Sequence, residues 1–272
     1  MDQDQQPIPA IIDTNVPSVA RMYDYYLGGK DNYEVDRRAS DELSAMAPGT
    51  RALAINNRQF LIRAVRFLVD ELGIRQFLDH GSGLPTQDNV HQVAQSVDPD
   101  ARVVYVDNDP IVLAHGRALL QTDERTVVVQ ADVRDTEAIF DDPEVEQMLD
   151  LEQPMAALFV SFLHCIPDVD DPAALVARVM SRLAPGSAVV ISHLASDDDD
   201  VRAQLTEFML TNTQGNWGRV RTTAEVAQLF VGLSVHDPGL VEISRWQPDS
   251  EQPGEVQLTH EWIEYGGVAI KQ

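Results

Sequence analysis

The spacing of hydrophobic residues changes near residue 73 of the chain. Between residues 56 and 72 apolar side chains recur at helical spacing, which predicts one long amphipathic helix. Its apolar face consists of Phe60, Leu61, Ala64, Val65, Leu68 and Leu72. Gly73 supplies a stop for this helix, and short runs of β-branched residues follow it. The change predicts a helical first part and a second part that contains strands.

The second part alternates between two kinds of pattern. Continuous apolar runs predict strands at 74–78, 102–106, 126–130, 156–162 and 188–192. Helical spacing and cap residues predict the segments between them as helices at 87–97, 109–120, 143–149 and 171–183. Shorter helices are expected before the long helix, at 18–27 and 36–46. After the last of these strands we expect helices at 201–210 and 223–230 and strands at 240–244 and 262–270.

The predicted strands are continuously apolar, which is typical of strands that have helices over both faces. With the strand–helix alternation, this predicts an α/β fold. We expect a doubly wound, Rossmann-like, mostly parallel seven-stranded sheet with helices on both faces. The last two strands are expected to add an antiparallel hairpin at one edge. Residues 1–55 are expected to form an N-terminal helical cap or lid, and residues 56–272 the domain beneath it.

The charge balance narrows the classes of partner. The 272 residues include 20 Lys and Arg against 44 Asp and Glu, a net charge of −24. Because such a surface repels phosphate groups and anionic lipids, we expect neither nucleic acid nor a membrane as a partner. Cys165 is the single cysteine, which excludes disulfides and cysteine-based zinc sites within one chain. We expect a cytoplasmic location, because the sequence shows no signal-like apolar region and no membrane-spanning apolar run.

The first candidate binding residues lie where the strand 74–78 ends. The stretch Asp79–Gly83 reads Asp-His-Gly-Ser-Gly and precedes a predicted helix. Its two glycines let a ligand approach the backbone, and free N–H groups at a helix start favour polar or anionic groups. A tight strand–helix turn is the alternative interpretation. The third glycine of a dinucleotide-binding fingerprint is missing, because Pro85-Thr86 stands in its place.

Carboxylates also end the next two predicted strands. Asp107 ends the second strand, where it can accept hydrogen bonds from both hydroxyl groups of a ribose. Asp109 directly precedes Pro110, so we expect it to cap the following helix. Asp132 ends the third strand, where it can accept a hydrogen bond from an exocyclic amine such as that of adenine. The carboxyl ends of parallel strands share one edge, so Asp79, Asp107 and Asp132 are predicted to line one crevice.

Three acidic residues at the ends of three successive strands resemble the class I S-adenosylmethionine-dependent methyltransferases. The stretch Leu163–Asp168 resembles their HH-x-P-D segment, with Cys165 in place of one His. The stretch Leu183–Ser187 resembles their L-x-P-G-G turn, with Ser187 in place of the second Gly. A narrower resemblance is to one actinobacterial group of S-adenosyl methyltransferases, formerly described as a domain of unknown function. It rests on the stretches Arg21–Tyr33, Asn57–Leu61, Asp79–Thr86, Val104–Pro110 and Asp237–Leu240.

The resemblance implies S-adenosylmethionine as the cofactor, S-adenosylhomocysteine as its product and methyl transfer as the reaction. The cofactor-binding residues it implies are Asp79, Gly81, Ser82, Gly83, Asp107, Asn108, Ala131, Asp132, Val133, Ser161 and Phe162. His164 is the candidate general base, and a structural role is the alternative. Candidates for a lid or for acceptor binding are Arg21, Tyr23, Tyr25, Tyr26, Lys30 and Tyr33. The histidines show no spacing of zinc ligands, so no metal is expected.

Two other functions remain as alternatives. An NAD(P)-dependent Rossmann oxidoreductase would use the glycine turn and Asp107, but it leaves Asp79 and Asp132 without a role. A protein that binds S-adenosylmethionine without catalysis is the second alternative, since the sequence contains no unambiguous base. The preferred hypothesis is methyl transfer to a small-molecule acceptor, whose identity the sequence does not reveal. A homodimer is left open.

Overall fold

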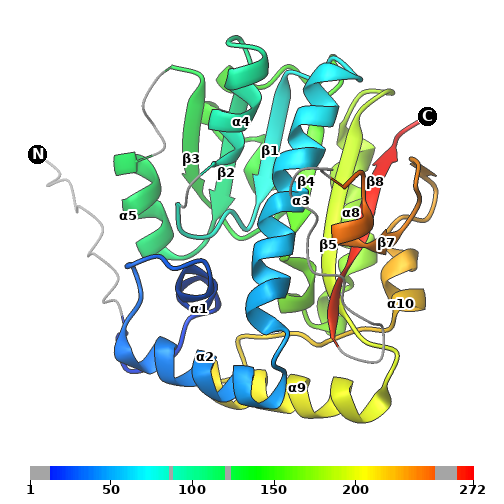
Figure 1. Ribbon diagram of the computed structural model, residues 1–272. Helices are drawn as coiled ribbons and strands as arrows, with labels where there is room; N and C mark the ends of the chain where they lie inside the picture. Colours follow the sequence, from blue (N-terminus) through cyan, green and yellow to red (C-terminus); the bar gives the residue numbers. More distant parts are fainter. Residues whose placement is uncertain (1–12, 86–87, 120–123, 249–261) are drawn as a thin grey trace, which may run out of the picture.

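The computed structural model describes residues 13–85, 88–119, 124–248 and 262–272, and their strands form one eight-stranded sheet (Figure 1). The strands are β1 (Gln76–His80), β2 (Arg102–Asp107), β3 (Thr126–Gln130), β4 (Ala156–Val160), β5 (Ala188–Ala195), β6 (Ser234–Val235), β7 (Val241–Glu242) and β8 (Ile263–Ile270). Their order is β3-β2-β1-β4-β5-β8-β6, and β7 also pairs with β8. The strand order therefore reverses between β1 and β4: β2 and β3 lie on one side of β1, and β4 and β5 lie on the other.

The pairing confirms a mostly parallel sheet with an antiparallel C-terminal edge. Strands β1 to β5 pair in parallel, whereas β8 runs antiparallel to β5 along its whole length. The sheet has one strand more than the predicted seven, because Ser234–Val235 also pairs with β8. Two exposed residues are too few to produce a strand pattern in the sequence. The predicted strand at 240–244 shortens to β7 and continues as a 3₁₀ turn, Ile243–Arg245.

Helices connect the strands largely as predicted. They are α1 (Val19–Tyr26), α2 (Glu34–Met46), α3 (Thr50–Asp70), α4 (Val90–Val97), α5 (Pro110–Leu119), α6 (Thr136–Phe140), α7 (Pro143–Met148), α8 (Pro172–Arg182), α9 (Asp199–Asn212) and α10 (Thr223–Gln228). The short helix α6 was not predicted, and α3 begins before the predicted start at residue 56. None of the described helices combines the length and hydropathy that crossing a membrane requires.

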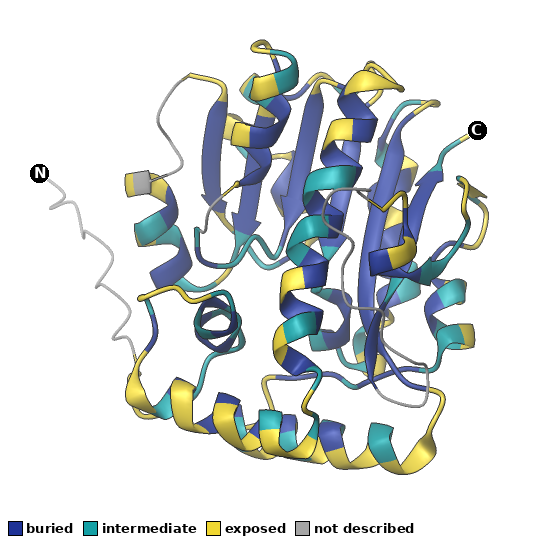
Figure 2. Ribbon diagram, in the orientation of Figure 1, coloured by how far each residue is buried: buried dark blue, intermediate teal, exposed yellow. Residues whose placement is uncertain are grey.

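The core lies in two layers, one on each face of the sheet. Figure 2 shows that the central strands are buried along most of their length. Successive residues of β1 alternate between the two layers: Phe77 packs with α3 and α4, and Leu78 packs with α6, α7 and α8. Both side chains are fully buried. Burial of such side chains stabilises the fold by roughly 25 cal/mol per Å² of apolar surface. The two layers explain why the strands read as continuous apolar runs.

A third apolar cluster joins α1, α2, α3 and α9 beyond the carboxyl ends of the parallel strands. Figure 1 shows α1, α2 and α9 below the sheet, at the end toward which these strands point. The predicted cap boundary at residue 55 falls inside α3, which continues from the cap onto the sheet. From here on we name the layer of α1, α2, the start of α3 and α9 the cap; its segments lie far apart in the sequence.

A buried ion pair holds α1 to the start of α2. Arg21 Nε lies 2.8 Å from Asp36 Oδ2, and both side chains are almost completely buried. Asp36 also accepts hydrogen bonds from the backbone N–H groups of Ser18 at 2.9 Å and Tyr33 at 2.8 Å. One carboxylate thus fixes the beginning of both helices.

We expect the substitution Asp36→Asn to destabilise the protein by about 3 to 5 kcal/mol, because it leaves the buried Arg21 guanidinium unpaired. Urea unfolding followed by circular dichroism measures this change. Asp41→Asn is the matched control, since Asp41 is exposed and accepts a hydrogen bond only at the surface, from Tyr25. Its effect should stay within about 0.5 kcal/mol. Equal effects of the two substitutions would show that the ion pair does not hold the cap.

Candidate active site

A cavity of about 340 Å³ lies between the cap and the carboxyl ends of the parallel strands. The ends of β1 to β4 line one side of it, and residues of α1, α2, α3 and α9 line the other. Its size lies within the range of small-molecule sites, roughly 300 to 1,000 Å³. Ligands of doubly wound sheets bind at this edge, near the point where the strand order reverses.

The glycine turn after β1 forms one wall of the cavity. Gly81 has a φ of +70°, and a Cβ atom there would lie 2.0 Å from Cδ2 of Phe162, so only glycine fits. The N–H groups of Gly81 and Ser82 donate to the Val106 carbonyl oxygen at 2.8 and 3.2 Å. A Cβ on Gly83 would meet nothing within 4 Å, so the backbone there borders open space. These contacts fix the turn against β2 and leave its cavity side accessible.

Asp79 lies at the end of β1 and lines the cavity. Only 7% of its surface is exposed. Burial is the main cause that raises its pKa to about 7. The positive charge of Arg58 opposes this rise, and the negative charge of Asp107 adds to it. The carboxyl group is therefore partly protonated near neutral pH, and a cation beside it would favour its charged form.

Arg58 is a cavity residue that the sequence reasoning did not single out. It lies on α3 and lines the cavity. Its Nε atom is buried and has no hydrogen-bond partner among the described residues. The only signal for it in the sequence was the family-like stretch Asn57–Leu61, because the helical pattern places a polar residue there on the solvent side.

Asp107 lines the cavity at the end of β2 and also supports the glycine turn. Its carboxylate accepts hydrogen bonds from the N–H groups of Gly83 and Asp109, both at 2.9 Å. Burial raises its pKa, and these backbone donors limit the rise. Asp109 accepts from the Ile111 N–H at 2.8 Å, which confirms the predicted helix cap.

Asp132 lines the cavity at the end of β3, together with Val133. Arg134 binds its carboxylate through two nitrogens, with Nη2 2.6 Å from Oδ2, and Arg134 also pairs with Asp170 at 3.0 Å. The hydrogen bonds from Arg134 lower the pKa of Asp132. The Asp132 carboxylate is therefore charged, and Arg134 already occupies part of its hydrogen-bonding capacity. The sequence did not predict this ion pair. Ala131 is not a lining residue; its N–H donates to the backbone of Asp107.

A chain of polar contacts runs from the end of β4 to β8. Ser161 has a left-handed backbone with a φ of +55°, and its hydroxyl donates to Glu264 of β8. Glu264 is buried, and burial raises its pKa to about 8, so the carboxyl group is largely protonated at neutral pH. The N–H of Ser161 donates to Ser192 Oγ of β5 at 2.9 Å. These contacts hold Ser161 in its strained conformation at the cavity wall.

The same chain continues into the cap. Ser192 Oγ donates to Asn57 Oδ1 at 2.6 Å, and Asn57 Nδ2 donates to the Tyr23 hydroxyl at 2.9 Å. Tyr23 in turn donates to the Ala54 carbonyl oxygen at 3.1 Å. Burial raises the pKa of Tyr23 to about 12, so the phenol stays protonated. The sheet and the cap are thus joined by hydrogen bonds beside the cavity.

His164 lines the cavity, but only 2% of its surface is exposed. Its Nδ1 atom accepts a hydrogen bond from the Leu194 N–H at 3.3 Å, and its ring lies 4.8 Å from that of Trp217. Burial lowers its pKa well below the usual value, and His193 and Arg221 add to this effect. These contacts favour the structural alternative for His164 over a general base.

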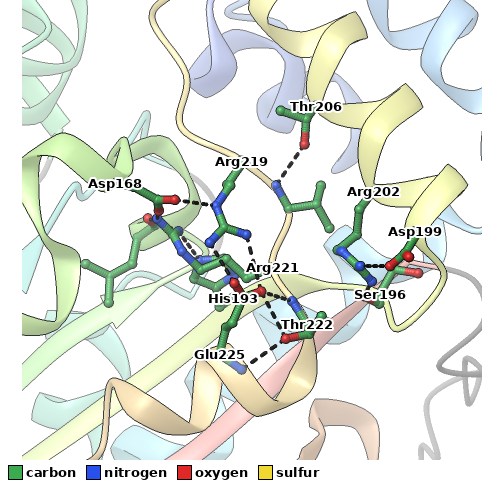
Figure 3. A network of polar contacts seen from close by, with 12 residues as sticks. Asp168, His193, Ser196, Asp199, Arg202, Thr206, Arg219, Arg221, Thr222 and Glu225 are labelled. Carbon is green, nitrogen blue, oxygen red and sulfur yellow. Dashed lines mark hydrogen bonds and ion pairs between the residues drawn. The ribbon is translucent and has the colours of Figure 1, made fainter.

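Arg221 fixes the loop that carries His164, and Figure 3 shows its contacts with Asp168 and His193. Its guanidinium donates to the carbonyl oxygens of Leu163 at 3.2 Å and Ile166 at 3.1 Å, and it lies 2.6 Å from Asp168. It also lies 2.8 Å from His193 Nε2. The group is 3% exposed, so these contacts are shielded from water. Nothing in the local sequence pattern indicated this residue.

The predicted lid residues divide into two groups. Tyr23 and Tyr26 line the cavity, as the lid hypothesis requires. The other four residues do not line the cavity. Arg21 forms its ion pair with Asp36, and Tyr25 donates a hydrogen bond to Asp41 at the surface. Lys30 and Tyr33 are exposed. The sequence showed that this segment is polar and aromatic, but it did not show which side of α1 faces inward.

Comparisons with known proteins agree on one family. A family model described as S-adenosyl methyltransferase matches residues 5–272. No curated protein matches the chain. A protein from Thermobifida fusca YX, provisionally named a methyltransferase and known from a crystal structure, is 42% identical in sequence to this chain. The match covers 96% of this chain and 97% of that protein, with a TM-score of 0.89. A DUF574 family protein from Streptomyces avermitilis is 39% identical over 96% of this chain and 99% of its own, also with a TM-score of 0.89.

A more distant structure shows the same fold. The plantazolicin methyltransferase BamL, in complex with a triazolic desmethylPZN analogue and S-adenosylhomocysteine, is 13% identical. It covers 93% of this chain and 95% of its own, with a TM-score of 0.52. At this identity the likeness concerns the fold alone.

We expect Arg221→Met to loosen the loop after β4, because the Ile166 carbonyl oxygen loses the guanidinium donor and the Leu163 carbonyl oxygen keeps only the Ile166 N–H. Hydrogen exchange of the peptide Leu163–Ile166, followed by mass spectrometry, should become faster, and stability should fall by about 2 to 4 kcal/mol. Arg219→Met is the control, because Arg219 is one third exposed and contacts only the carboxylates of Asp168 and Glu225. Unchanged exchange in Arg221→Met would contradict the role assigned to this residue.

Proposed function

The chain belongs to the S-adenosyl methyltransferase family, and we propose that its strand-end cavity holds S-adenosylmethionine beside a small-molecule acceptor. The protein is an S-adenosylmethionine-dependent methyltransferase. This membership decides against the nicotinamide-dependent alternative. The observation that carries the proposal is that one cavity joins the acidic ends of β1 to β3 to an apolar space under the cap. The sources of the two similar structures are in keeping with an actinobacterial origin.

The residues at the glycine turn suit the amino-acid end of the cofactor, which carries an ammonium and a carboxylate group. Asp79 is a buried carboxyl group whose charged form a cation would stabilise. Arg58 acts on it electrostatically and has an unpartnered Nε, so it can bind the carboxylate. The buried Ser82 hydroxyl also has no partner among the described residues. A zwitterion would satisfy all three groups.

The ends of β2 and β3 suit the nucleoside end. Asp107 has lone pairs beyond those used by two backbone donors, and a carboxylate here can accept hydrogen bonds from ribose hydroxyls. Asn108 lines the cavity beside it. Asp132 and Val133 line the position proposed for adenine, where Asp132 accepts from the exocyclic amine while Arg134 holds its carboxylate in place.

The chain contributes alignment and exclusion of water to the reaction. S-adenosylmethionine supplies an electrophilic methyl group on a positively charged sulfur. Ser161, Phe162 and Tyr23 line the same cavity. Tyr23 stays protonated and His164 has a strongly lowered pKa, so both are weak bases at neutral pH. Holding the acceptor in line with the methyl group therefore accounts for most of the proposed catalysis.

Asp107→Ala should weaken binding of S-adenosylhomocysteine about 100-fold, because two charge-assisted hydrogen bonds to ribose are lost. Isothermal titration calorimetry measures the affinity directly. The matched control is Asp100→Ala, which removes an exposed carboxylate just before β2, at the opposite end of this strand, and should leave the affinity unchanged. An unchanged affinity in Asp107→Ala would contradict the proposed ribose site.

The affinity should also depend on pH through Asp79. Its pKa is about 7 in the free protein, and a bound ammonium group lowers it, so binding below pH 7 releases a proton. The affinity for S-adenosylhomocysteine should therefore rise toward pH 7, by up to about tenfold per pH unit. Calorimetry in buffers of different ionisation enthalpy counts the released proton.

Asp79→Asn isolates this effect, because it removes the titrating group and leaves the buried Glu264 unchanged. The variant should bind more weakly and with a flat dependence on pH over this range. A wild-type affinity that falls toward pH 7, or equal slopes in the two proteins, would contradict the role of Asp79.

A further inference from the structure

The cap side of the cavity has a chemical character of its own. Several lining residues belong to the apolar cluster under the cap, and we name this part of the wall the indole chamber: Met22, Tyr26, Leu43, Leu53, Ala54, Leu194, Met209, Trp217 and Trp262. None of them carries a charge. The charged residues of the described lining that lie at or just beyond the strand ends are Asp79, Asp107, Asp109, Asp132 and Arg134. The remaining one, Arg58, lies on α3 and is not part of the chamber; its positive charge acts on Asp79. The chamber therefore suits a neutral ligand.

Two tryptophans in the chamber carry hydrogen-bond donors for which the described residues offer no acceptor. Trp217 and Trp262 are 3% and 4% exposed, and neither indole Nε1 has a partner among the described residues. A buried donor without a partner costs about 1 to 3 kcal/mol. Buried tryptophan N–H groups usually have a partner. A molecule in the cavity that offers an acceptor atom would recover this free energy.

The backbone holds Trp217 firmly in place. The N–H of the next residue, Gly218, donates to the His164 carbonyl oxygen at 3.1 Å. A Cβ atom on Gly218 would lie 2.4 Å from the Ile166 carbonyl oxygen, so the two segments touch along their backbones. The Trp217 ring lies against that of His164. The indole is therefore a preorganised donor.

The chamber's own hydroxyl groups do not compete for this role. The Tyr26 hydroxyl donates to the Ser40 carbonyl oxygen at 2.8 Å. At the chamber's edge Thr50 donates to the Ala47 carbonyl oxygen at 2.6 Å. Among the nine chamber residues, the side-chain donors left over are thus the two indole N–H groups. They call for a ligand oxygen that accepts hydrogen bonds.

We propose that the methyl acceptor is a neutral, flat aromatic molecule with a hydroxyl or amino group that takes the methyl group and a separate carbonyl or ether oxygen that accepts hydrogen bonds from Trp217 and Trp262. The methyl carbon leaves the sulfonium sulfur as it bonds to the hydroxyl oxygen or amino nitrogen, and the proton of that group passes to solvent. Aromatic walls bind flat rings by offset and edge contacts, which adds to the apolar burial. The inference rests on the proposed function, because it names the chemical class of the acceptor in the same cavity.

Trp246 provides a matched control inside the same chain. Its Nε1 also has no partner among the described residues, and its side chain is fully buried. However, it packs edge-on against Phe60 and Phe67 at ring distances of 5.5 and 5.6 Å, and it is not among the cavity residues. Trp246→Phe therefore changes one buried tryptophan without touching the chamber.

The test compares coumarin, a flat neutral lactone, with naphthalene, which has the same shape and no oxygen. Equilibrium dialysis in the presence of S-adenosylhomocysteine gives both affinities. Wild type and Trp246→Phe should bind coumarin about tenfold more tightly than naphthalene. Trp217→Phe and Trp262→Phe should each lose most of this preference, because phenylalanine keeps the apolar ring and removes the donor.

Several results would overturn the inference: equal binding of the two probes to wild type, no saturable binding of coumarin, or a preference that survives in both chamber variants. If a chamber variant fails to fold, a crystal structure of wild type with coumarin decides, since the lactone oxygen must lie within hydrogen-bond distance of an indole nitrogen. Calorimetry with S-adenosylhomocysteine distinguishes a failure of the proposed function from a failure of the proposed acceptor class. Loss of that binding in wild type contradicts the proposed function, whereas normal binding without probe preference contradicts the acceptor class alone.

Discussion

The burial of one carboxyl group, Asp79, is the constraint around which the site is organised. It ends the first strand of the sheet, and burial raises its pKa to about 7. Burying such a group disfavours its charged form unless a cation lies near it. Arg58 compensates in part, and an ammonium group of the proposed cofactor would complete the compensation. The fold offsets the cost through two apolar layers that cover both faces of the strand.

The remaining parts of the site depend on contacts that join the sheet to the cap. Hydrogen bonds lead from Glu264 and Ser161 through Ser192 and Asn57 to Tyr23, so β8, β4, β5, α3 and α1 are linked beside the cavity. Arg221 fixes the loop after β4 from the other side. The cavity thus has walls held by polar contacts and a lining that is acidic at one side and apolar at the other. Such a division matches a reaction between a charged cofactor and a neutral acceptor.

The sequence predicted well what depends on local pattern. Asp79, Asp107 and Asp132 follow apolar runs directly, and parallel pairing brings such strand ends together whatever the details of the loops. Asp109 shows its capping role within three residues. The residues that were missed, Glu264 and Arg221, act over long separations: Glu264 lies 103 positions from Ser161, and Arg221 lies 53 positions from Asp168. No periodicity records such a pairing. The lid residues were predicted only in part for the same reason, since Arg21 faces Asp36 on a helix whose position depends on the tertiary fold.

A crystal structure with S-adenosylhomocysteine tests the central claim most directly. The account predicts the ammonium nitrogen within hydrogen-bond distance of Asp79, the ribose hydroxyls at Asp107 and the sulfur facing the chamber that contains Trp217 and Trp262. A ligand bound outside this cavity, or bound in it with its ribose away from Asp107, would contradict the account.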